Sequence, residues 1–88
     1  MKVKLYAVLD SASGVYDGPV PANADGVALR NFTNMARSDN NAVGKNPECF
    51  SIWRVGEWND ATGEVTPETK ECLGHAVDLI GNNEKELN

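Results

Sequence analysis

The sequence has few of the residues on which catalytic and metal-binding sites depend. Its 88 residues include one histidine, His75, and two cysteines, Cys49 and Cys72, with no C-x-x-C pair. It also has no glycine-rich phosphate loop and no nucleophile elbow. Nucleophilic catalysis needs a nucleophile, a base and an orienting group within reach of one another. We therefore expect no enzyme activity, no catalytic residues, no metal site and no cofactor.

Long apolar runs are also missing. No segment approaches the roughly 20 apolar residues that a membrane-spanning helix needs, and the opening "MKVKLYAVLD" is too short and too polar for a signal peptide. We therefore expect a cytoplasmic protein without a membrane partner. In that compartment both cysteines should be reduced and unpaired.

The charge is unevenly distributed along the chain, which has a net charge of −5. Residues 1–56 contain six basic and five acidic residues, whereas residues 57–88 contain two basic and eight acidic ones. Because the acidic C-terminal third repels phosphate, we do not expect indiscriminate binding of nucleic acid over the whole surface. This third is a solvated acidic face, a surface for a basic partner, or a guard that limits how DNA engages the N-terminal part.

Alternating apolar residues predict an α+β domain over residues 1–80, with a small antiparallel sheet of about three to five strands. The strands are expected at 3–10, 15–22 and 50–58, with a short one at 63–66. Pro19 and Pro21 cannot donate to a ladder, so this second segment should be either an edge strand or an irregular arm. Residues 40–48 read as a loop, and residues 81–88 as a flexible acidic tail.

One main helix is predicted over 24–38, packed on one face of the sheet, with Asn23 or Asp25 as its N-cap. Its apolar stripe should enter the core, and comprises Ala28, Leu29, Phe32, Met35 and Ala36. Residues 67–80 fit either a helix, which Pro67 would start, or a strand; the helix is the preferred alternative.

The segment "FSIWRVGEW" has bulky residues at both parities of a strand. Either both faces of this strand are covered, or Gly56 marks a bulge that changes the side on which Trp58 lies. We expect Trp53 to face the helix, because no cation shares its parity. Trp58 should share a side with Arg54.

Binding of single-stranded DNA requires cations for phosphates and aromatic rings for bases. The candidate residues for such binding are Lys2, Lys4, Tyr6, Arg30, Arg37, Arg54 and Trp58. In a small domain most aromatic residues are core residues, so packing is the competing interpretation of each ring.

Three segments, "KLYAVLDSASGVY", "DGVALRNF" and "VGKNPECFSIWRVGEWNDATGEV", occur in an order that resembles one family. This family is the small non-structural protein of gokushovirus-like microviruses, which are tailless phages with single-stranded DNA genomes. Members carry an acid before the aromatic residue in "PEDY" or "PEDF"; here Cys49 stands in its place.

The resemblance implies a phage protein of the host bacterial cytoplasm, with a role in genome replication or in the switch to single-strand synthesis and packaging. Single-stranded DNA is then the expected partner. The alternative is a protein-interaction or self-assembly module that acts on replication or capsid machinery, with a phage or host replication protein as its partner. In either case so small a domain favours a homo-oligomer, most simply a dimer.

Overall fold

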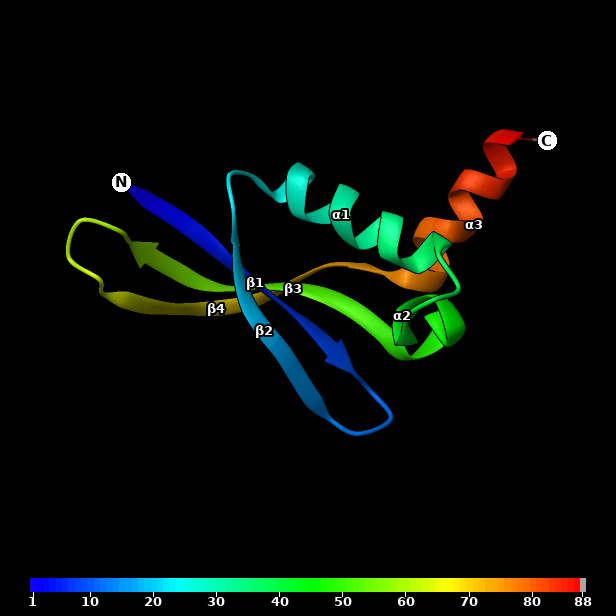
Figure 1. The fold of residues 1–88 in the computed structure, drawn as a ribbon, viewed down its shortest axis with the longest axis horizontal. Helices are drawn as coiled ribbons and strands as arrows, with labels where there is room; N and C mark the ends of the chain where they lie inside the picture. Colours follow the sequence, from blue (N-terminus) through cyan, green and yellow to red (C-terminus); the bar gives the residue numbers. More distant parts are fainter. Residues whose placement is uncertain (88) are drawn as a thin grey trace.

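The computed structural model describes the backbone of residues 1–87 and the side chains of residues 1–81. Four strands and three α-helices alternate with short turns (Figure 1). The helix α1 lies along the sheet, α2 and α3 gather at one end, and the β3–β4 turn projects at the other (Figure 1). The elements are β1 (Lys2–Asp10), β2 (Val15–Ala22), α1 (Asp25–Arg37), α2 (Ala42–Lys45), a 3-10 turn (Pro47–Cys49), β3 (Phe50–Asn59), β4 (Val65–His75) and α3 (Ala76–Leu87).

The four strands form one antiparallel sheet in the order β2-β1-β3-β4. Two hairpins build it, and each closes on a glycine with positive φ: Gly14 at 75° and Gly63 at 79°. Residues other than glycine rarely adopt a positive φ, which explains why glycine follows Ser13 and Thr62 in these turns. The predicted α+β class is confirmed. The proline-bearing strand β2 is an edge strand, as expected.

The helix α1 packs on the sheet through one stripe, as predicted. Ala28, Phe32 and Ala36 are buried, and Phe32 is 1% exposed. Met35, which we expected in the core, is 42% exposed because it lies at the margin of the helix contact. The predicted cap is also wrong: the N-cap is Ala24, without a side-chain cap bond.

The core lies between α1 and the face of the sheet that carries Tyr6 and Ile52. The short helix α2 adds the buried Val43, so the segment predicted as a loop contributes to the core. Asn41 caps α2, since its side-chain oxygen accepts from the backbone N–H of Gly44. Ala76, at the start of α3, completes the buried cluster.

We preferred a helix for residues 67–80, and this prediction is wrong for the part that ends at His75. Val65–His75 is a single strand paired along β3, and α3 begins only at Ala76. The backbone N–H and C=O groups of this segment find hydrogen-bond partners in β3. These hydrogen bonds decide its conformation, although its apolar residues have helical spacing. Gly74 leaves room for Leu29 and Leu79, whose methyl groups lie 3.4 Å from where a Cβ would stand. The segment predicted as a tail from residue 81 belongs to α3 as far as Leu87, and residue 88 lies outside the described residues.

A bulge in β3 decides the side on which Trp58 lies. Arg54 pairs with Tyr6 and Gly56 pairs with Leu5, so Val55 is an extra residue between them. Gly56 is required there, because a Cβ would stand 2.7 Å from the carbonyl oxygen of Thr66. The bulge moves Trp58 to the side opposite Arg54, which corrects our expectation that these two residues share a face.

Trp53 also lies on the side opposite to the one we expected. Its neighbours Ile52 and Arg54 face α1: Ile52 belongs to the core cluster and Arg54 binds Asp25 of α1. Alternation along the strand therefore directs Trp53 away from α1. The alternation of side chains between the two faces was predicted correctly for residues 50–54. The face that α1 covers was predicted wrongly.

Candidate nucleic-acid interface

The face of the sheet opposite α1 carries both tryptophans. We call it the open face, because the described helices lie on the other side of the sheet. Residues that pair directly on neighbouring strands share a face, and the register assigns this face to a mainly apolar set. Its members are Val3, Leu5, Ala7, Leu9, Tyr16, Ser51, Trp53, Trp58, Val65, Cys72 and His75.

An aromatic and cationic cluster lies at the middle of the open face. The rings of Tyr16 and Trp53 meet edge to face, with centroids 6.3 Å apart and planes at 80°. Lys70 Nζ lies 4.6 Å from the centroid of Tyr16 and 6.0 Å from that of Trp53, and donates to the Tyr16 hydroxyl at 3.1 Å. A cation over aromatic rings on a sheet is an arrangement suited to a base and its phosphate.

Trp58 extends this surface toward the β3–β4 turn. It pairs with Val3 on one side and Val65 on the other, and it is only half-buried. Val65 is 63% exposed. Trp53 is half-buried too, and its indole N–H donates to Ser51 Oγ at 2.9 Å, which fixes the ring on the sheet. Both indoles are thus partly exposed, and that of Trp53 is held in position by its hydrogen bond.

The acidic residues of the four described strands all fall on the side of α1. The register places Asp10, Asp17, Glu57 and Glu71 there, and Glu68 on the same side bonds Lys4. The open face therefore has Lys70 as its nearest charge and no acidic side chain from these strands. The carboxylates of the strands therefore do not lie against a phosphate bound there.

Lys2 and Lys4 are engaged with acids on the side of α1. Lys4 Nζ lies 2.9 Å from Glu68 and 3.4 Å from Glu57, and Lys2 lies 3.9 Å from Glu57. The hydrogen bond from Lys4 to Glu68, and next that to Glu57, raise the pKa of Lys4 above its ordinary value, although desolvation lowers it. Their charge is offset within the protein, which leaves little of it for a phosphate.

Arg54 and Tyr6 both bind Asp25, in the first turn of α1. Tyr6, which is 1% exposed, donates to Asp25 Oδ1 at 2.7 Å, and Arg54 bridges Asp25 and Glu71. Burial, followed by the bond to Asp25, raises the pKa of Tyr6 to about 12. Desolvation lowers the pKa of Arg54, but Asp25 and Glu71 outweigh it and hold the pKa above its ordinary value. These contacts tie α1 to the sheet, and the buried Tyr6 ring offers no stacking surface.

Arg30 and Arg37 lie on the exposed side of α1, two helical turns apart. The structure therefore separates the predicted residues into three places: Arg30 and Arg37 on the helix, Trp58 on the open face, and the remaining four on the side of the sheet that faces α1. Sequence reasoning missed Tyr16 and Lys70 as members of the aromatic cluster. For Tyr16 the only available signal was the alternation of side chains along the strand segment "VYDG". Lys70 was missed because its segment was predicted to be a helix.

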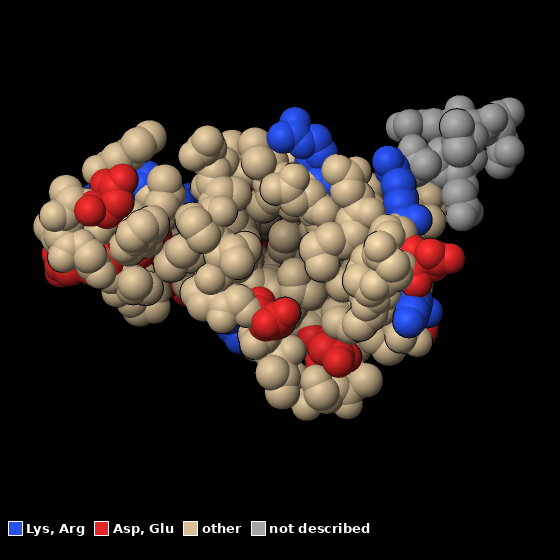
Figure 2. Space-filling view, in the orientation of Figure 1, with Lys and Arg blue, Asp and Glu red and all other residues tan. Residues whose placement is uncertain are grey.

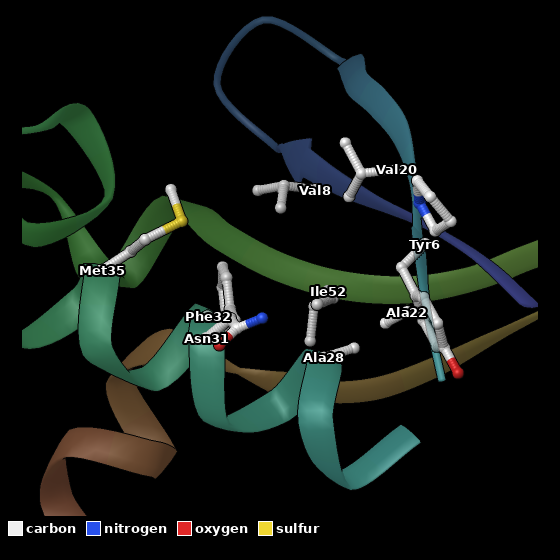
Figure 3. Close-up of a pocket in the computed structure, with 10 residues that line it drawn as sticks. Tyr6, Val8, Val20, Ala22, Ala28, Asn31, Phe32, Met35 and Ile52 are labelled. Carbon is white, nitrogen blue, oxygen red and sulfur yellow. The ribbon is translucent and has the colours of Figure 1, made fainter. Parts of the chain in front are cut away.

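An apolar groove opens between α1 and the β1–β2 hairpin, with a volume of about 100 Å³. Figure 2 shows the surface hollowed near its centre at this place. Figure 3 shows Met35 and Phe32 from α1 and Val8 and Val20 from the hairpin around one space. Val20 is 59% exposed. This groove lies on the α1 side, away from the aromatic cluster.

Within the described residues, no group of three or more His, Cys, Asp or Glu side chains is placed to hold a metal ion. None of the helices in that part of the chain is both long enough and apolar enough to span a membrane.

Comparison with known proteins gives one match. The family model described as "Phage ORF5 protein" matches residues 3–79, which is most of the chain. The chain belongs to the Phage ORF5 protein family. It is therefore a small phage protein, as the sequence resemblance implied. Searches among curated proteins and among solved structures found no match.

Proposed function

We propose that this member of the Phage ORF5 family is an accessory protein that binds single-stranded DNA on the open face of its sheet. The observation that carries the proposal is the cluster of Tyr16, Trp53 and Lys70, with Trp58 farther along the same face. Bases stack on exposed aromatic rings without regard to sequence, and a neighbouring cation holds the phosphate. This pattern fits a protein that coats or marks single strands.

The distribution of charge supports the same surface. The strand acids lie on the side of α1, where they already bind Lys4 and Arg54. A DNA strand on the open face therefore avoids the carboxylates of the four β-strands. Arg30 and Arg37 lie on the exposed side of the helix, where they would serve a strand that passes around the domain edge.

The resemblance to gokushovirus-like non-structural proteins suggests when this binding would act. We propose a role in genome replication, at the switch from duplex replication to single-strand synthesis and packaging, in the cytoplasm of the host. A protein that binds single strands and not duplexes would act at this step.

The test is a salt-titrated binding assay with oligothymidine and with a duplex of equal length. We expect tryptophan fluorescence to be quenched by the single strand, with an affinity that falls steeply as salt increases. Lys70→Gln should weaken binding, while Lys45→Gln, on the exposed side of α2, serves as the matched control. Absence of binding at low salt, or equal losses for both variants, would reject the proposed DNA surface.

The second candidate is a protein-interaction module. It is favoured by the apolar character of the open face, where the partly exposed Val3, Leu9 and Val65 lie near the tryptophans. A surface of this composition also suits another protein. In that case sedimentation would detect a complex, and DNA would leave the tryptophan fluorescence unchanged at any salt concentration.

A further inference from the structure

Cys72 and His75 form a close pair on the open face. Cys72 Sγ lies 3.7 Å from His75 Nε2 and 3.8 Å from the carbonyl oxygen of Gly74. Cys72 is a free, half-buried cysteine, and His75 is exposed at the end of β4. DNA binding by the aromatic cluster gives this pair no role.

A second bulge creates the pair. Residues three apart on a regular strand lie on opposite faces. Here Trp53 pairs with Cys72 while Ile52 pairs with Gly74, so Leu73 is an extra residue in β4. The bulge brings Cys72 and His75 to the same face, beside Trp53 and Ser51. The thiol and the imidazole are thus placed together by the backbone.

The spacing of the pair matches half of a zinc site. Zinc binds thiolate sulfur at about 2.3 Å and imidazole nitrogen at about 2.0–2.1 Å, so two tetrahedral ligands stand roughly 3.6 Å apart. The observed separation is 3.7 Å. Structural zinc sites take four ligands, and in the described part of one chain no third His, Cys, Asp or Glu joins the pair.

We propose that two copies of the chain share one zinc ion, bound by Cys72 and His75 of each copy. The second copy supplies the two ligands that the first lacks, which gives a Cys2His2 set related by a two-fold axis. Zinc binding displaces one proton from each Cys72 thiol to solvent, so the ion and the two thiolates together are neutral.

The position of the pair suits a second copy. β4 is an edge strand of the sheet, and His75 is exposed at its end. Metal binding and oligomerisation are two of the usual means of stabilising a small domain. A shared zinc ion would provide both.

The test measures assembly and metal content together. Chelator-treated, reduced protein is titrated with Zn²⁺ by calorimetry, and its mass is followed by analytical ultracentrifugation. We expect one zinc ion per two chains and a shift from monomer to dimer. Co²⁺ in place of Zn²⁺ should give the visible bands of a tetrahedral thiolate site.

Variants identify the ligands. Cys72→Ser and His75→Asn should each lower zinc affinity by more than about 100-fold, since loss of a ligand exceeds the effect of outer-shell changes. Both should retain the parental melting temperature without zinc. Cys49→Ser is the matched control and should leave affinity and stoichiometry unchanged.

Three results would overturn the proposal: no zinc binding at micromolar zinc, one zinc ion per monomeric chain, or an equal loss in Cys49→Ser. None of these results depends on DNA, so the zinc site and the DNA surface fail or stand separately.

Discussion

The two faces of the sheet are built by the same four strands and yet differ in almost every physical property. The face toward α1 buries Tyr6 and Ile52, and carries the strand acids together with the cations that bind them. The open face has half-buried tryptophans and Lys70 over the Tyr16 ring. Residues on the first face are occupied with one another, whereas Tyr16, Trp53, Trp58 and Lys70 on the second keep part of their surface exposed.

This difference indicates how to separate stability from function in a chain of 88 residues. A change on the α1 side should alter the free energy of unfolding. A change on the open face should mainly alter binding. The following predictions test that division, beginning with the largest expected effect.

Phe32→Ala should lower the free energy of unfolding by about 3–5 kcal/mol, because it leaves a cavity under α1 where Phe32 is 1% exposed. Chemical denaturation followed by circular dichroism measures this change. Met35→Ala, on the same helix but 42% exposed, should cost about 1 kcal/mol or less. A similar loss of unfolding free energy in both variants would mean that α1 does not pack on the sheet through Phe32.

Tyr6 should make stability depend on alkaline pH. Its folded pKa of about 12 exceeds the ordinary value of 10.0, so the folded state retains a proton that the unfolded state releases. This contribution, about 3 kcal/mol, is complete below pH 10 and is lost as pH rises toward 12. Urea melts between pH 9 and 12 measure it.

Tyr6→Phe removes the titrating hydroxyl and should lack this part of the alkaline loss. Tyr16→Phe leaves the bond between Tyr6 and Asp25 in place and should behave as the parent does. If the parent and Tyr6→Phe lose stability in parallel, Tyr6 is not held by Asp25.

Trp58→Ala should weaken binding of oligothymidine by about 1–3 kcal/mol, which is the range for one stacked base. Fluorescence anisotropy of labelled DNA measures the loss. Val65→Ala, directly opposite Trp58 on the same face, removes apolar surface without an aromatic ring and is the matched control. An unchanged affinity for Trp58→Ala would assign the ring to packing.

Lys70→Gln should give the smallest effect. Removing one phosphate contact lowers the slope of log affinity against log salt by about 0.7 for a single strand. The slope from four or more salt concentrations measures it, with Lys45→Gln as the reference. A slope equal to the parental value would show that Lys70 remains on the Tyr16 ring and does not contact phosphate.

The sequence by itself determined the strands at the start of the chain, the edge position of the proline-bearing strand, and α1 with Phe32 in the core. These features follow from local chemistry. Alternation, proline and a helical stripe act within a few residues, and nothing in the tertiary structure opposes them.

Only the tertiary structure decided residues 67–75, the faces of the tryptophans and the contents of the candidate site. Helical and strand spacing compete in that segment, and β3 resolved the competition by pairing with all of β4. The bulges at Val55 and Leu73 exist only in relation to partner strands, so they leave no period in the sequence. Each shifts by one residue the side on which the following residues lie. For that reason Trp53 and Trp58 share a face, as do Cys72 and His75, although a regular strand would place each pair on opposite faces.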